Sequence, residues 1–99
     1  MSVLDGLIKK HKELFKSVAI RFLRERKKAI LEELSNIEEK IKKFEKEYGN
    51  FKEFSSSLSD NFSAHEIWFE WRSLMELKKE LEKELRDIEN ATKEIIGQK

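Results

Sequence analysis

Two histidines are the residues of this sequence whose chemistry could build a reactive or metal-binding site: His11, and His65 with Glu66 in "SAHEIWFEW". A zinc-protease helix needs a second histidine four residues after the first, so that both imidazoles lie on one face beside the glutamate. Position 69 is Phe, and neither histidine has a Glu three residues before it, as di-iron bundles use. The sequence therefore predicts no metal site and no cofactor.

Other catalytic patterns are also missing from the sequence. It contains no cysteine, no serine within a glycine-rich elbow and no glycine loop that could hold a phosphate. Its many carboxylates alternate with lysines, which is typical of solvated helix faces. We therefore expect a protein that is not an enzyme.

The composition favours long solvated helices. Among 99 residues, 41% are charged, Pro is absent and Gly occurs three times. The first 25 residues lack the apolar core and cleavage pattern of a signal peptide, and no run approaches the ~20 apolar residues of a membrane span. These observations predict a soluble cytoplasmic protein with no membrane partner.

Two apolar stripes at helical spacing run through the first half of the chain. The step between them, from Phe22 to Ile30, is eight residues where seven would continue the pattern, so the register slips within 24–28. Gly49 follows the second stripe, where a left-handed glycine ends many helices. We expect one helix, or two nearly continuous ones, over 2–48. The stripes comprise Leu4, Ile8, His11, Phe15, Val18 and Phe22, then Ile30, Leu34, Ile37, Ile41, Phe44 and Tyr48.

Residues 49–63 form the predicted connection. Asn50 could cap a short helical turn that carries Phe51, Phe54 and Leu58, and the polar run 55–61 predicts turn and loop. Ser63 and Glu66 have capping-box spacing, with Phe62 and Ile67 at the positions of a hydrophobic staple. This pattern indicates that the histidine-glutamate pair belongs to a helix start.

The last third of the sequence carries the most regular pattern. Apolar residues recur every seventh position from Ile67, and Gly97 is the expected stop, so we predict a second helix over 64–96. Lys78 and Thr92 occupy seam positions that a two-stranded zipper would keep apolar, which favours a bundle. The recurring residues are Ile67, Leu74, Leu81, Ile88 and Ile95.

Two long helices with a short connection predict an all-α fold, a coiled-coil-like antiparallel hairpin within a single domain, 1–99. Residues 30–48 then lie against 67–88. The arm 3–23 has no intrachain partner of equal length, and an amphipathic helix with an uncovered stripe is unstable in water. We therefore expect a homodimer in which the arms help to form a helical bundle.

Charge is segregated along the chain. Nine basic residues and two acids between positions 9 and 28 give +7, so the remainder carries −6. The basic segment could pair with the acidic part of another copy, bind an acidic protein or nucleic acid, or be a solvated face. Against nucleic acid, Phe15 and Phe22 belong to the apolar stripe and not to the basic face. The candidate nucleic-acid residues are Lys9, Lys10, Lys16, Arg21, Arg24, Arg26, Lys27 and Lys28.

Aromatic residues gather between positions 44 and 71, where they could close the hairpin tip or contact another protein. The stretches "FEKEYGNFKEF", 44–54, and "HEIWFEW", 65–71, resemble a pattern in small archaeal and bacterial helical proteins assigned as antitoxins of toxin–antitoxin pairs. The similarity covers about residues 40–88. It implies binding and neutralisation of a small toxin, and the matching positions are Tyr48, Phe54, Trp68, Phe69 and Trp71.

Overall fold

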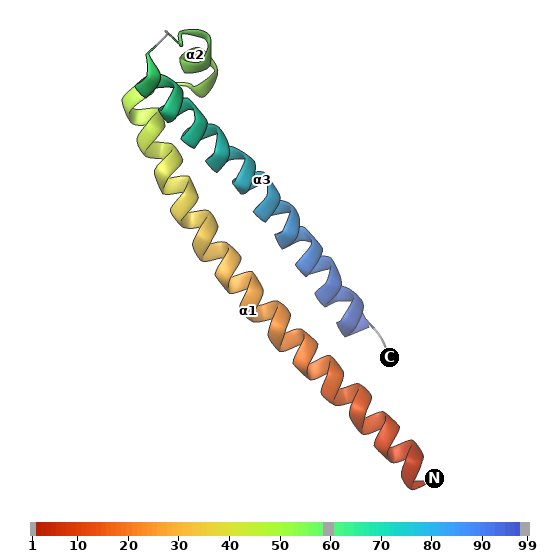
Figure 1. Ribbon diagram of the computed structural model, residues 1–99. Helices are drawn as coiled ribbons and strands as arrows, with labels where there is room; N and C mark the ends of the chain where they lie inside the picture. Colours follow the sequence, from red (N-terminus) through yellow and green to blue (C-terminus); the bar gives the residue numbers. More distant parts are fainter. Residues whose placement is uncertain (1, 59–60, 98–99) are drawn as a thin grey trace.

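The computed structural model describes residues 2–58 and 61–97, and three helices account for almost all of that part of the chain. Helix α1 spans Val3–Tyr48, α2 spans Phe51–Ser56 and α3 spans Phe62–Gly97. Figure 1 shows α1 and α3 side by side and antiparallel, with α2 at the closed end. The N-terminal part of α1 continues beyond the end of α3, in a molecule 75 Å long and about 20 Å wide. The predicted all-α hairpin with an N-terminal arm is confirmed.

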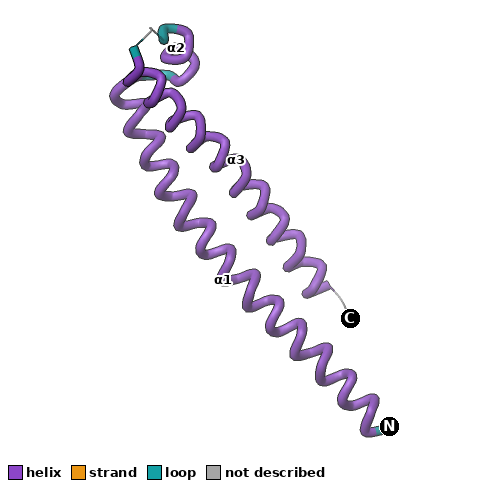
Figure 2. Tube along the Cα trace, viewed as in Figure 1, coloured by secondary structure: helices purple, strands orange, loops and turns teal. Residues whose placement is uncertain are grey.

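Helix α1 is a single uninterrupted helix of 46 residues (Figure 2). It begins after Ser2, whose side chain accepts a hydrogen bond from the Asp5 amide at 3.2 Å. The register slip at 24–28 does not break the helix, because Arg, Glu and Lys are all good helix formers. Instead, the slip makes the apolar stripe before position 24 face a different direction from the stripe after position 28. Leu23 packs against the core, whereas Phe22, about 100° round the helix, is 66% exposed.

The core lies between the C-terminal half of α1 and most of α3. Four residues of α1 at alternating steps of four and three face three residues of α3. Because this spacing keeps one face of α1 against α3, the side of the seam that α1 contributes has a buried apolar residue at every step from Ile30 to Ile41. The buried residues are Ile30, Leu34, Ile37, Ile41, Trp71, Leu81 and Ile88.

The two polar residues of the seam have partners inside the hairpin. The Lys78 ammonium lies 3.7 Å from the Glu38 carboxylate across the interface and 4.0 Å from Glu82 on its own helix. The Thr92 hydroxyl donates to the Ile88 carbonyl at 2.8 Å. The seam therefore tolerates both residues without burying an unpaired polar atom.

Gly49 ends α1 with φ 80° and ψ −145°, and its amide donates to the Glu45 carbonyl at 2.8 Å. The predicted positive φ is confirmed, although ψ is extended and not left-handed helical; glycine alone adopts this region easily.

Asn50 caps α2, because its side chain accepts a hydrogen bond from the Lys52 amide at 2.7 Å. Ser55 and Ser56 lie in α2, so the predicted loop is shorter than expected. Leu58 lies beyond α2, and 59–60 of that loop lie outside the described residues.

The predicted start of the second helix is wrong by two residues. Helix α3 begins at Phe62, and the Asn61 side chain accepts a hydrogen bond from the Ser63 amide at 2.9 Å. Asparagine is at least as good an N-cap as serine, and the earlier cap adds residues to the helix. Ser63 therefore lies inside the first turn, and the expected capping box with Glu66 does not form. Phe62 is 75% exposed, so it forms no hydrophobic staple.

Candidate partner-binding surfaces

Trp71 is the centre of the aromatic cluster that closes the hairpin tip. Its ring stacks on Phe44 of α1 with centroids 5.5 Å apart and 14° between planes. From α2, Phe51 meets it edge-on at 5.1 Å and Phe54 lies at 5.7 Å. Only 1% of Trp71 is exposed. The cluster thus joins all three helices, as aromatic pairs in offset or edge geometry do.

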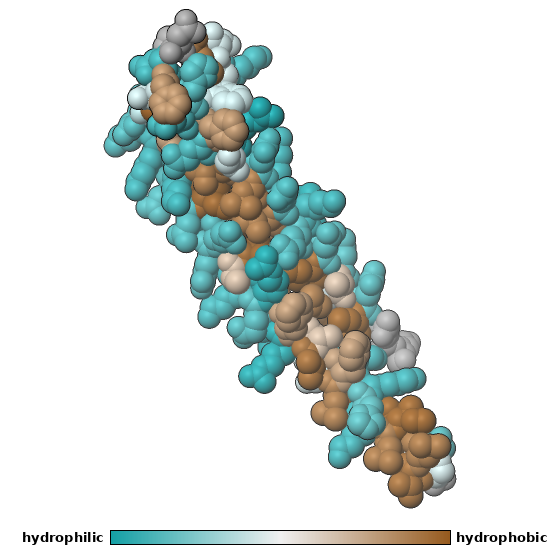
Figure 3. Space-filling model, in the orientation of Figure 1, coloured by the Kyte–Doolittle hydropathy of each residue, from teal (hydrophilic) through white to brown (hydrophobic). Residues whose placement is uncertain are grey.

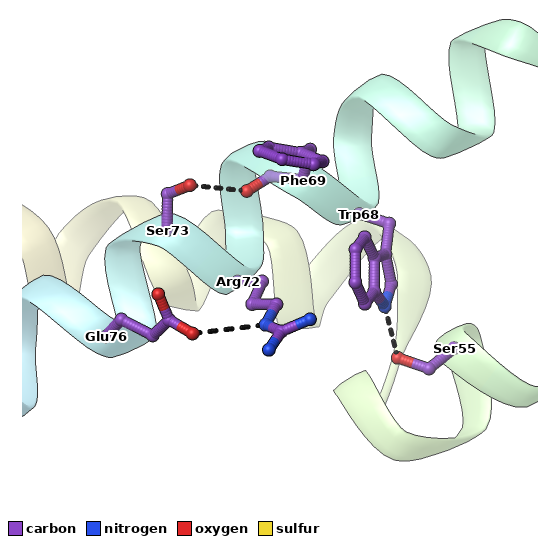
Figure 4. Close-up of polar contacts among 6 residues, drawn as sticks. All are labelled: Ser55, Trp68, Phe69, Arg72, Ser73 and Glu76. Atoms are coloured by element: carbon purple, nitrogen blue, oxygen red, sulfur yellow. Dashed lines mark hydrogen bonds and ion pairs between the residues drawn. The ribbon is translucent and has the colours of Figure 1, made fainter.

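Trp68 joins this cluster through Phe51, with ring centroids 6.2 Å apart, and Figure 4 shows its polar contact with α2. Its indole N–H donates to the Ser55 hydroxyl at 2.7 Å, which ties α3 to α2. The Arg72 guanidinium lies 5.2 Å from the indole ring and pairs with the Glu76 carboxylate at 3.1 Å. Trp68 is therefore half-buried and held by a polar bond and a cation–π contact.

The five predicted partner-binding residues divide by exposure. Trp71 is fully buried, so the prediction that it contacts a partner does not hold for the folded hairpin. Phe54 and Trp68 are half-buried within the cluster. Tyr48 is 37% exposed at the rim, where burial and the Glu47 carboxylate raise the pKa of its hydroxyl. Phe69, 69% exposed, presents most of its ring to solvent.

Phe62 belongs to the same exposed surface, although sequence reasoning assigned it to a staple. It lies seven residues before Phe69, so both rings lie on one face of α3 and point away from the seam. The seven-residue spacing in the sequence was the signal that could have found this pair. Phe62 and Phe69 together form the tip patch.

The arm carries the largest exposed apolar surface. Every large apolar side chain between residues 3 and 18, together with Phe22, is 49–82% exposed. Figure 3 shows brown side chains gathered at the free end of α1, beyond the end of α3. We call this set the arm stripe: Val3, Leu4, Leu7, Ile8, Leu14, Phe15, Val18 and Phe22.

The end of α3 determines where the arm becomes unaccompanied. A groove of about 450 Å³ lies between α1 and the last turns of α3, lined by Ile20 and Leu23 on one side and Thr92 and Ile96 on the other. The face of α1 that packs against α3 is apolar at Leu23 and Ile20. Nearer the N-terminus the same face carries polar residues, such as Lys16. The arm stripe points in another direction, so α3 would not cover it even if α3 were longer.

Two of the predicted nucleic-acid residues are engaged within the hairpin. Arg26 donates two hydrogen bonds to the Glu84 carboxylate, at 2.9 and 3.0 Å, and Lys27 lies 3.8 Å from Glu89. The hydrogen bonds and charge of Arg26 hold the pKa of Glu84 below its ordinary value, and Glu84 raises the pKa of Arg26. Both pairs are half-exposed, and they connect the basic segment to α3.

The other candidate basic residues lie on two faces of α1. Lys10, Arg21, Arg24 and Lys28 are exposed and fall within about 60° of one another on a helical wheel. Lys9 and Lys16 lie about 100° round the helix, on the line that continues the seam. The structure therefore assembles four of the eight candidates into one basic face.

Some kinds of site are absent from residues 2–58 and 61–97. They contain no group of three or more His, Cys, Asp or Glu side chains that could hold a metal ion. None of the helices in this part of the chain is long and apolar enough to span a bilayer. Comparison with protein-family models, curated proteins and solved structures finds no match for the chain.

Proposed function

We propose that this chain is a cytoplasmic, non-enzymatic protein-binding module whose principal binding surface is the arm stripe. The observation that supports it is the exposure of eight large apolar side chains along one helix, which no other part of residues 2–58 and 61–97 covers. Contiguous exposed apolar surface of this kind marks interaction sites in soluble proteins. Covering it would stabilise the complex at roughly 25 cal/mol for each Å² removed from water.

The tip patch is the second surface of the proposed module. The resemblance to antitoxins implies that aromatic residues at this end bind and neutralise a toxin, and Phe69 is the most exposed of the matching positions. Phe62 extends the same surface by one aromatic ring. We therefore propose antitoxin-like binding at the tip patch as the specific form of the function.

Affinity capture from the native host tests the proposal. The bait is the full chain, compared with an arm variant, Phe15→Asp with Val18→Asp, and a tip variant, Phe62→Ser with Phe69→Ser. A protein that binds the native bait but not one of the variants identifies the surface that it contacts. A second copy of this chain is counted as such a protein. Retention of the same proteins by all three baits would contradict the proposal.

Nucleic-acid binding is a second candidate function, favoured by the exposed basic face of Lys10, Arg21, Arg24 and Lys28. Phosphate contacts from four cations predict that log K falls with log salt at a slope of about −3 to −4. Fluorescence anisotropy with labelled single- and double-stranded oligonucleotides, from 50 to 300 mM salt at about those values, measures the slope. Arg21→Gln with Arg24→Gln should make the slope shallower by about 2. No binding at low salt would remove this candidate.

A further inference from the structure

We propose that the arm stripe is covered by the arm of a second copy of this chain, packed antiparallel so that residue n of one copy lies opposite residue 26 − n of the other. This inference rests on the proposed function and names the partner of the arm. Such a contact is isologous: the same surface is used twice about a two-fold axis. The axis would pass through the contact at the level of residue 13, and the Glu13 side chain points away from the contact on the outer face of the helix.

The spacing along the middle of the arm stripe fits this arrangement. One line of residues there has steps of four, three, four, three and four, which read the same in both directions: Leu4, Ile8, His11, Phe15, Val18 and Phe22. Leu4 of one arm therefore lies opposite Phe22 of the other, and Ile8 opposite Val18. His11 lies opposite Phe15 in the two central layers. Every layer of the contact thus contains an apolar residue from each arm except the two that hold His11.

The area of the stripe is sufficient for a stable dimer. With exposed fractions of 49–82%, the eight side chains present on the order of 1,000 Å² of apolar surface per arm. Two arms packed along the stripe would remove most of this area from water on both copies. The total approaches the roughly 1,600 Å² of a standard specific interface.

Leu14, which lies beside the line from Leu4 to Phe22, favours antiparallel over parallel packing. In an antiparallel pair the two Leu14 side chains lie on the same side of the contact and only two residues, about 3 Å, apart along the helix axis, so they can touch across the two-fold axis. In a parallel pair Leu14 would face Ala19, five residues further on, which is a much smaller apolar side chain. The antiparallel pair therefore buries more apolar surface at Leu14.

The positive charge of residues 24–28 also favours antiparallel packing of the two arms. Residues 24–28 hold four cations and one acid, and a parallel pair would place the two segments side by side. In the antiparallel pair, residue 27 of one copy and residue 27 of the other lie about 42 Å apart at 1.5 Å per residue. This distance exceeds the Debye length of about 8 Å at physiological salt, so their repulsion is screened.

The hairpin bodies leave room for the second arm. Leu23 faces α3, and Phe22 points about 100° away from it. Two arms in contact through their stripes therefore keep α3 of each copy on the outer side of the pair. The second arm passes the end of α3 without a clash, because it lies on another face of α1.

The arms themselves carry like charge. Between residues 3 and 23 there are five cations and two acids, so each arm has a net charge of +3. Salt screens the repulsion between two such arms, so the dimer should tighten as the salt concentration rises. Nucleic-acid binding by the same segment would weaken with salt, and the sign of the salt effect distinguishes the two.

Sedimentation equilibrium of the full chain is the first experiment. We expect a monomer–dimer equilibrium whose Kd falls between 50 and 500 mM salt, about a threefold to tenfold effect. His11→Leu, which completes the two central layers, should lower the Kd by about tenfold or more, and Phe15→Asp should raise it by about 100-fold or more. A gain from His11→Leu cannot arise from misfolding.

Cysteine cross-linking determines the direction, since the native chain has no cysteine. We expect Leu14→Cys to form a disulfide dimer under mild oxidation, and Glu13→Cys, on the outer face, to remain reduced. A mixture of His11→Cys and Phe15→Cys chains should give the mixed dimer in excess of either homodimer. Disulfide formation by Phe15→Cys or Val18→Cys alone would show parallel packing and overturn the inference.

The outcomes separate this inference from the proposed function. A chain that stays monomeric at all concentrations and salts, with His11→Leu having no effect, overturns self-pairing. If that monomer still captures host proteins through the arm stripe, the proposed function stands with a different partner. If the Phe15→Asp and Val18→Asp changes alter neither mass nor capture, both fail.

Discussion

Phe44 and Trp71 stack with ring centroids 5.5 Å apart, and this pair joins the end of α1 to the third turn of α3. Phe44 stands one turn before the end of its helix, and Trp71 also receives Phe51 and Phe54 from α2. A hairpin of two long helices can slide along its seam by one heptad, because each heptad looks alike. The aromatic pair fixes the register, since only one alignment seats the indole.

The first prediction concerns Trp71. Replacing it by Ala should lower the free energy of unfolding by about 3–5 kcal/mol, because it removes a fully buried indole and leaves a cavity among three helices. Urea denaturation followed by circular dichroism measures the loss. It should be accompanied by a broader transition, because the tip no longer fixes the register.

Phe69→Ala is the matched control, two residues earlier on the same helix. Its ring is 69% exposed, so the free protein should lose less than about 1 kcal/mol. Equal losses from the two substitutions would contradict the division of the tip into a buried core and an exposed surface.

The second prediction tests the turn at Gly49. Its φ of 80° with extended ψ lies in a region that residues with a Cβ rarely adopt, although nothing lies within 4 Å of an added Cβ. Gly49→Ala should therefore cost about 1–3 kcal/mol of backbone strain, measured by urea denaturation. Gly6→Ala, in helical backbone with equally open surroundings, should not destabilise and should raise the helix content. A neutral Gly49→Ala would show that the turn relaxes.

The third prediction separates the two candidate caps of α3. Asn61→Ala removes the oxygen that accepts from the Ser63 amide and should cost about 0.5–2 kcal/mol. Ser63→Ala should change the stability by less than about 0.5 kcal/mol, because that side chain lies in the first turn of an already capped helix. Thermal melts of both variants provide the comparison. A larger loss of stability from Ser63→Ala than from Asn61→Ala would show that Ser63 is the N-cap and that the capping box forms.

The seam could be predicted from the sequence, whereas helix ends could not. Apolar spacing over six or more residues averages out single exceptions, so one helix to Tyr48 and the recurrence from Ile67 both emerge clearly. A helix end depends on one or two hydrogen bonds, and Asn61 and Ser63 are nearly equal as caps. Local sequence cannot decide between them, because the choice depends on how α2 and α3 meet.

The sequence predicts which way the apolar faces of α1 point, but it does not predict which residues pair across the hairpin. The slip between Phe22 and Ile30 already indicates that the arm stripe and the seam face different neighbours. The partners of Arg26 and Lys27 on α3 depend on pairing between residues about 60 positions apart. Spacing within one helix carries no information about such pairs.

The last prediction is a pH dependence at the Arg26–Glu84 pair. Because Arg26 lowers the pKa of Glu84 in the folded protein, the pair stabilises the fold fully above the unfolded pKa of about 4.5. That contribution is lost as the pH falls through the lowered folded value, where the carboxyl protonates. Glu84→Gln should therefore melt at a lower temperature than the native chain at pH 7, and the gap should close below pH 4.5. Glu80→Gln, which removes a charge from an exposed position one turn away, should show a much smaller gap. A gap at Glu84 that is constant from pH 7 to about 3 would mean that the carboxylate charge contributes nothing to the pairing of α1 with α3.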